Sequence, residues 1–252
     1  MIFQGISEAK YITMETVVTV QIQGDFVQVH VMVVNKGDEP AYNVKISAEI
    51  NGNIKSAPLK ESLKPNDPYS EDLAAPIEYK KPGRYPVIVI VDYTDQNQYP
   101  FTALSVVYVN YQETVVGRVV GQIETTPVTD RGEVKVKVRN LEQSEEKIAV
   151  RLVVPKELTA PVSKKEVSLK SGAEETVVID ISNLSALPGS NYQIYALLTY
   201  EHDRYYYSNA IGGSIKVEEK KSVLNTYRGL LIVAAIALVL IVAYFNIRRR
   251  PH

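Results

Sequence analysis

Histidines and clustered carboxylates are the residues whose types could support catalysis or metal binding, and both are sparse in this sequence. The histidines are His30, His202 and His252, and neither His30 nor the terminal His252 has an acid or a nucleophile at a recognisable spacing. A Ser-His-Asp site would need long-range assembly that no spacing indicates. We therefore expect no catalytic residues, no enzyme activity and no cofactor.

Two expected hairpins carry a pair of carboxylates each, Asp92 with Asp95 and Glu201 with Asp203. Calcium requires about six to eight oxygen ligands, more than one such pair supplies. Aspartate also favours turn backbones without any metal. We interpret both pairs as turn residues and predict no metal site, while calcium binding stays open as the alternative.

Tyrosine is the abundant aromatic residue, with 17 copies and no tryptophan. The densest run is Tyr205, Tyr206 and Tyr207, in which a strand would place Tyr205 and Tyr207 on one face and Tyr206 on the other. Such rings either pair across strands to stabilise the sheet or form a half-exposed binding surface for a protein or a glycan. These three tyrosines are the candidate partner-binding residues.

A possible modification site lies at Asn183-Leu184-Ser185, which fits the N-glycosylation tripeptide. The tripeptide is common by chance, and it matters only if this part of the chain lies outside the cytosol.

Apolar residues alternate with polar ones through most of the chain, which indicates strands with one face in a core. Val27, Val29, Val31 and Val33 follow this pattern. The run Val87–Val91 is apolar at every position and predicts a central strand. Turn residues separate these runs, and no long amphipathic helix appears, so we predict all-β sandwiches.

The chain also repeats itself. Tyr85 and Tyr93 recur as Tyr192 and Tyr200, and the strand ending at Asn35 recurs as one ending at Asn140. Two copies of one sandwich explain the repeat. The expected parts are a lead-in (1–15), a first Ig-like sandwich (16–111), a second (112–217), a stalk (218–228), a transmembrane helix (229–247) and a basic tail (248–252).

The C-terminal region carries the membrane signal. From Gly229 and Leu230 to Ile247 the sequence is almost wholly apolar, long enough to cross the roughly 30 Å core of a bilayer as a helix. Arg248, Arg249 and Arg250 follow directly, and the positive-inside rule places them in the cytoplasm. The lipid bilayer is thus an expected partner, and the N-terminal domains are expected on the extracytoplasmic side.

Composition narrows the partners further. The 252 residues include 28 basic and 29 acidic side chains and no cysteine. Four of the arginines lie at or beyond residue 228, so the rest of the chain is acidic, which argues against nucleic acid. Disulfides and thiolate sites are excluded. Met1–Lys10 shows no signal peptide, so the chain either begins after processing or truncation, or is tail-anchored with both domains in the cytosol.

Two turn regions carry a resemblance to known families. Asn35, Gly37, Ala41 and Asn43-Val44 resemble the strand-turn-strand of CARDB-type Ig-like domains. The second copy is similar to NEW3-type domains through Asn140, Val153-Val154-Pro155, the Ser171–Thr176 turn and Pro188-Gly189 before Tyr192. It departs from the pattern at Leu141, where a glycine is usual. With the span, the chain resembles archaeal and bacterial S-layer-domain-like surface proteins, which implies fold and location but no active site.

These observations predict an all-β protein of two tandem Ig-like sandwiches followed by one C-terminal transmembrane helix. We expect a non-catalytic, membrane-anchored, extracytoplasmic binding or scaffolding protein with an unidentified protein or surface-glycan partner. The alternative is an accessory subunit of a larger membrane complex, such as a transporter or a glycan-handling enzyme.

Overall fold

The computed structural model describes residues 11–219 and residue 236. Within this part every regular element up to residue 217 is a β-strand, and the described residues up to 217 form one compact unit. The all-β prediction is therefore confirmed for these residues. No helix of the described part is long and apolar enough to span a bilayer. Apart from Ile236, the predicted span and the arginine tail lie outside the described residues.

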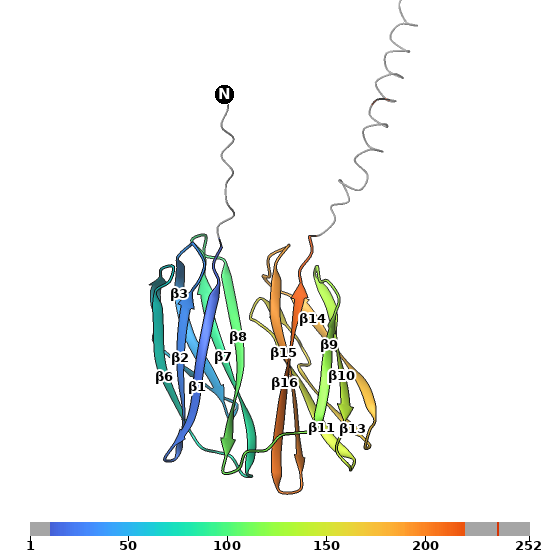
Figure 1. The fold of residues 1–252 in the computed structure, drawn as a ribbon. Coiled ribbons are helices and arrows are strands. Elements are labelled where there is room, and N and C mark those ends of the chain that lie inside the picture. The colour runs from blue at the N-terminus through green and yellow to red at the C-terminus, as the bar shows by residue number, and fades with distance from the viewer. Residues whose placement is uncertain (1–10, 220–235, 237–252) are drawn as a thin grey trace, which may run out of the picture. The chain divides into compact units, whose positions relative to one another are not determined.

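The first half of the chain forms a sandwich of two antiparallel layers (Figure 1). One layer has the order β1-β2-β6, and in the other β7 lies between β8 and β3, which also pairs with β4 and β5. The strands are β1 (Met14–Gln23), β2 (Phe26–Asn35), β3 (Ala41–Ile50), β4 (Asn53–Ser56), β5 (Lys60–Leu63), β6 (Pro68–Pro76), β7 (Gly83–Thr94) and β8 (Pro100–Tyr111).

The second half repeats this arrangement. One layer has the order β12-β14-β10-β9, and the other has the order β13-β11-β15-β16. The strands are β9 (Val119–Thr125), β10 (Arg131–Asn140), β11 (Glu146–Val153), β12 (Leu158–Thr159), β13 (Lys164–Leu169), β14 (Glu174–Asn183), β15 (Asn191–His202) and β16 (Tyr205–Lys216).

Each half has its own hydrophobic core, made by the alternating positions of the sequence. Val27, Val29, Val31 and Val33 of β2 are fully buried in one core. The equivalent valines of β10 are fully buried in the other. Burying such side chains is the main stabilising contribution, about 1.5–3 kcal/mol for each. The period-two interpretation of these strands is confirmed.

A buried asparagine closes the same turn in both halves. Asn35 is fully buried, donates through Nδ2 to the carbonyls of Glu39 and Leu63, and accepts from the Gly37 amide. Asn140 is also fully buried and makes the equivalent bonds, donating to the carbonyls of Ser144 and Leu169 and accepting from the Glu142 amide. Backbone groups that would otherwise be buried without partners are thereby satisfied.

This clamp corrects the turn alignment drawn from the sequence. The residue equivalent to Gly37 is Glu142, because each donates its amide to the clamping asparagine, so the departure lies at Glu142 rather than at Leu141. A Cβ at Gly37 would lie 2.2 Å from the Tyr11 carbonyl oxygen, so the first copy needs glycine there. In the second copy the close approach is at Gly117, where a Cβ would lie 2.8 Å from the Tyr200 hydroxyl.

We expect Asn35→Ala and Asn140→Ala to destabilise the chain to a similar extent, by about 2–4 kcal/mol each, since each removes three buried hydrogen bonds. The two residues belong to separate cores, so the costs in the double variant should add to within about 0.5 kcal/mol. Urea denaturation measures these free energies, and the exposed Asn97→Ala is the control, expected within about 0.5 kcal/mol of wild type. A double variant no less stable than either single one would contradict the repeated role.

Candidate functional site

The two sandwiches meet at a junction inside the compact unit, and this junction holds the tyrosines that the sequence singled out. Tyr206 at the start of β16 pairs in parallel with Gly83 at the start of β7, and its amide donates to the Pro82 carbonyl. A Cβ at Gly83 would lie 2.0 Å from the Tyr206 carbonyl oxygen, and its φ of +150° also favours glycine. Only glycine therefore allows this contact without displacement of the backbone.

A stack of tyrosine rings continues from this contact. The Tyr206 and Tyr85 rings are parallel, with centroids 4.3 Å apart, and Tyr79 stacks on the far side of Tyr85 at 3.8 Å. Burial raises the pKa of Tyr85 to about 12 and also raises the pKa values of Tyr79 and Tyr206. The ring of Tyr206 is thus engaged within the chain.

The other two candidate tyrosines also have intramolecular partners. Tyr205 donates its hydroxyl to Glu113 in the segment that links the sandwiches, at 2.6 Å, and Arg204 binds the other oxygen of that carboxylate. Tyr207 stacks on the buried Tyr200, with ring centroids 5.0 Å apart. All three candidates are half-buried, and their binding of a partner stays a prediction.

Further along β16 the junction is held by polar contacts. Ser208 donates its hydroxyl to the Arg84 carbonyl at 2.8 Å, and the Ala210 amide donates to the Tyr108 hydroxyl at 2.6 Å. Ser208 is almost completely buried, so its hydroxyl needs such a partner. The contacts recur at alternate residues of β16, as expected when one face of a strand lies against a neighbour.

A separate apolar cluster fills the centre of the junction. Ile88 of β7 and Leu104 of β8 pack against Val153 of β11 and Leu197 of β15, and all four are at least nine-tenths buried. Ile88 belongs to the run predicted as a central strand, whose valines face the first core. That run is apolar on both faces because one face lies in the sandwich core and the other in the junction.

An ion pair crosses the junction beside this cluster. The guanidinium of Arg151 binds both carboxylate oxygens of Glu49, with one N···O distance of 2.7 Å. Bidentate pairing of this kind fixes orientation as well as charge. The Glu49 carboxylate raises the pKa of Arg151, although partial burial opposes that shift.

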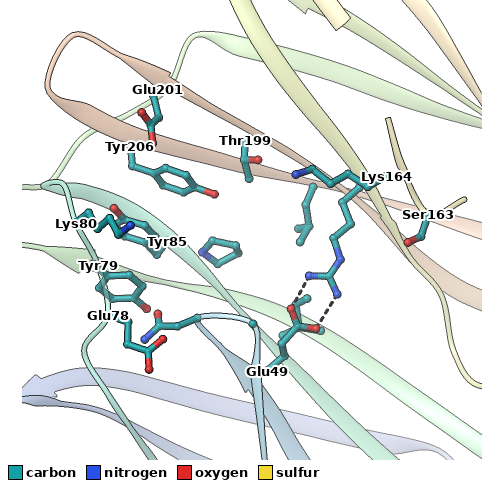
Figure 2. Close-up of a pocket in the computed structure, with 16 residues that line it drawn as sticks. Glu49, Glu78, Tyr79, Lys80, Tyr85, Ser163, Lys164, Thr199, Glu201 and Tyr206 are labelled. Atoms are coloured by element: carbon teal, nitrogen blue, oxygen red, sulfur yellow. Dashed lines mark hydrogen bonds and ion pairs between the residues drawn. The ribbon is translucent and has the colours of Figure 1, made fainter. Parts of the chain in front are cut away.

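A groove of about 650 Å³ opens between this ion pair and the tyrosine stack. Figure 2 shows Tyr79, Tyr85 and Tyr206 on one side and Glu49, with its two hydrogen bonds, on the other. Ile88, Leu197 and other apolar side chains also line it. The volume lies within the roughly 300–1,000 Å³ typical of small-molecule sites.

Two residues that line the groove each carry a buried polar atom with no hydrogen-bond partner, the hydroxyl oxygen of Tyr79 and the side-chain oxygen of Asn51. Most buried polar atoms in proteins are paired, so unpaired ones at a groove are unusual. The sequence does not show which residues form this site, because they come from strands far apart in the chain. The apolar runs on both faces of β7 and β15 were the available signal.

Glu157, just after β11, is the other unpartnered polar side chain of the described residues. It is fully buried, and neither carboxylate oxygen has a hydrogen-bond partner. Burial raises its pKa, its own backbone amide, Lys156 and Thr102 oppose the shift, and Asp92 adds a small further rise. Glu157 in turn contributes to the raised pKa of Tyr93, which burial brings to about 12. Glu157 therefore places a titratable group where the two sandwiches meet.

The carboxylate hairpins serve as turn and pairing groups. Asp95 accepts from the amides of Asn97 and Tyr99, and Asp92 binds Lys156 at 2.9 Å. His202 lies 2.7 Å from a Glu146 oxygen. Among residues 11–219 and 236, no group of three or more His, Cys, Asp or Glu side chains could hold a metal ion.

The candidate glycosylation residue Asn183 uses its side-chain amide within the fold. Its Nδ2 donates to the carbonyls of Thr129 and Ala186, and its Oδ1 accepts from the Ala186 amide. A glycan on that nitrogen would replace one of these hydrogen bonds. Glycosylation at Asn183 stays a prediction.

Comparisons with known proteins give a likeness of architecture only. No family model matches the chain, and no curated protein matches it. The predicted resemblance to CARDB-type and NEW3-type domains therefore gains no support from families and stays a prediction.

Among solved structures, native alpha-2-macroglobulin of E. coli matches 82% of this chain at 12% identity with a TM-score of 0.33. Salmonella alpha-2-macroglobulin reacted with methylamine matches 82% of this chain at 13% identity with a TM-score of 0.33. Red sea bream transglutaminase matches 84% of this chain at 10% identity with a TM-score of 0.30. The match spans 17%, 16% and 32% of those chains, and the likeness extends to β-sandwich architecture alone.

The buried Glu157 should make stability depend on pH. Its pKa is raised in the folded state above an unfolded value of about 4.3, so its proton stabilises the fold. The free-energy cost of burying the charged Glu157 carboxylate is absent below the pKa of the unfolded state. It grows as the pH rises through the pKa of the folded state. We expect Glu157→Gln to raise the free energy of unfolding by about 1–3 kcal/mol at pH 8, with a smaller gain at pH 4.5.

Urea denaturation of both proteins across this pH range measures the difference. Glu175→Gln, an exposed substitution on β14, is the control and should leave the pH profile unchanged. A Glu157→Gln profile parallel to that of wild type would contradict the assignment.

Proposed function

We propose that this chain is a non-catalytic, membrane-anchored binding and scaffolding protein, with its two sandwiches outside the cell membrane and its C-terminus in the cytoplasm. The observation that carries the scaffolding role is the junction, where an apolar cluster and the Arg151–Glu49 pair hold one sandwich on the other. Such contacts favour a single rigid body over two domains on a flexible linker.

The anchoring part of the proposal is supported by the sequence. The apolar segment 229–247 has the length of a membrane span, and the arginines after it have the charge expected on the cytoplasmic side. A rigid pair of sandwiches held at a membrane would present its loops and grooves in a fixed arrangement relative to one another.

In the alternative, the chain is an accessory subunit bound to a second membrane protein. Purification through a tag in mild detergent distinguishes this alternative from a free-standing surface protein. A second membrane protein in stoichiometric amount supports the accessory subunit, and a monomer or homo-oligomer supports a free-standing surface protein.

Cysteine labelling tests the orientation, because the chain has no cysteine of its own. We expect Ser70→Cys on β6 to react with a membrane-impermeant maleimide on intact cells, and His252→Cys to react only after permeabilisation. The two variants are controls for each other. The reverse pattern would establish the tail-anchored orientation and contradict the proposal.

A distance measurement tests the rigidity of the junction. Spin labels at Ser70→Cys and Thr176→Cys, one exposed site on each sandwich, should give a single narrow distance distribution by pulsed electron resonance. Gly83→Ala should broaden it and cost on the order of 1–3 kcal/mol, because the new Cβ collides with the Tyr206 backbone.

Gly172→Ala is the control for this variant. Its φ of +74° is also positive and therefore unfavourable for alanine, but a Cβ there meets no atom within 4 Å. It should leave the distance distribution narrow. A broad distribution in the wild-type protein would contradict the rigid scaffold.

A further inference from the structure

We propose that the groove at the junction, lined by Tyr79, Tyr206 and Asn51 on one side and Arg151 on the other, binds a neutral oligosaccharide. The proposal goes beyond the scaffolding role, since a rigid spacer needs no ligand. Four properties of the groove carry it: unpaired polar atoms, balanced charge, an apolar lining beside polar groups, and central strands that are paired on both sides.

The unpaired atoms require hydrogen-bonding partners of both kinds. The Asn51 side-chain oxygen accepts only, whereas the Tyr79 hydroxyl both donates and accepts. A ligand hydroxyl group can serve both, because it donates and accepts. Small adjustments of the Tyr79 side chain would bring its hydroxyl to the ligand, and binding would remove the cost of leaving it unpaired.

The charge of the groove selects for a neutral ligand. Its lining contains three carboxylates, Glu49, Glu78 and Glu201, and three cations, Lys80, Lys164 and Arg151. Glu49 is paired with Arg151, while Glu201 and Lys164 are paired with Lys81 and Glu166 outside the lining, which leaves Glu78 and Lys80. Neither an anion nor a cation therefore meets an excess of opposite charge, while every one of these groups can hydrogen-bond a hydroxyl.

The apolar part of the lining suits the C–H face of a sugar ring. Pro86, Ile88 and Leu197 line the groove together with the tyrosine rings. Sugar rings present hydroxyls at their edge and C–H groups on their face, so a site for them combines apolar surface with convergent polar groups. Three neighbouring residues are too few to hold an acyl chain.

A peptide fits the groove less well. Peptides commonly bind by adding a strand to an open sheet edge. The two central strands of the groove offer no such edge, because β7 is paired with β3 and β8, and β15 is paired with β11 and β16. Only β13, which begins at the lining residue Lys164, pairs on one side alone, with β11. Recognition over β7 and β15 must therefore use side chains, which a polyhydroxylated ligand can satisfy.

Calorimetry with the full-length chain tests the proposal, with maltotriose, mannotriose and triacetylchitotriose as probes. The detergent should be of the polyoxyethylene type, because the headgroup of a maltoside would compete. We expect at least one probe to bind, Tyr79→Phe to weaken that binding roughly fivefold, and the weakening to occur without loss of stability.

A second pair of variants tests whether the oligosaccharide binds in this groove. Ser163→Trp places a large ring among the groove residues and should weaken binding at least about tenfold by occlusion. Ser168→Trp lies on the exposed side of β13 outside the groove and should leave affinity unchanged.

Binding of none of the three probes overturns the proposal, as does binding that Ser163→Trp leaves intact. Retention of a peptide with no sugar binding would overturn it in favour of a peptide site. These outcomes are independent of the scaffold proposal, which the labelling and distance measurements decide without any ligand.

Discussion

The packing of one sandwich on the other is the constraint on which the rest of this structure depends. β7 and β15 are apolar on both faces, so each needs a second cover besides its own core. The cluster of Ile88, Leu104, Val153 and Leu197 supplies that cover. Exposing such side chains would cost about 25 cal/mol for each Å² of apolar surface. Because the sheets must meet there, Gly83 has to be a glycine, and Glu157 has to be buried.

The two sandwich copies differ in sequence at the residues through which each contacts the other. The asparagine clamp is the same in both, since each copy must close the same turn. Tyr206 has no aromatic counterpart in the first copy, where Pro100 occupies the equivalent place at the start of the last strand. The junction thus joins unlike surfaces of two like sandwiches. Its specificity comes from residues that only one copy carries.

The sequence predicted well what depends on local periodicity and poorly what depends on contact between distant strands. Alternating valines identified the cores, and matching tyrosines and asparagines identified the repeat. The apolar run Val87–Val91 indicated that both faces of its strand are covered. The periodicity of the sequence does not identify the residues that cover the second face. For Tyr205, Tyr206 and Tyr207 the sequence leaves both cross-strand pairing and a binding surface open, because the partners of Tyr205 and Tyr206, Glu113 and Tyr85, lie more than 90 residues away. Glu157 carries no signal, since nothing in a pattern distinguishes a buried glutamate from an exposed one.

The groove follows from the same packing that makes the unit rigid. Two twisted sheets in contact diverge away from their closest approach, so side chains fill the centre and a gap opens to one side. The walls of that gap are held by the tyrosine stack and by a bidentate ion pair, each fixed independently of a ligand. Pre-formed walls lower the entropy lost on binding. A rigid junction and a binding groove are therefore compatible uses of one interface, because the contacts that hold the sandwiches together also hold the groove open.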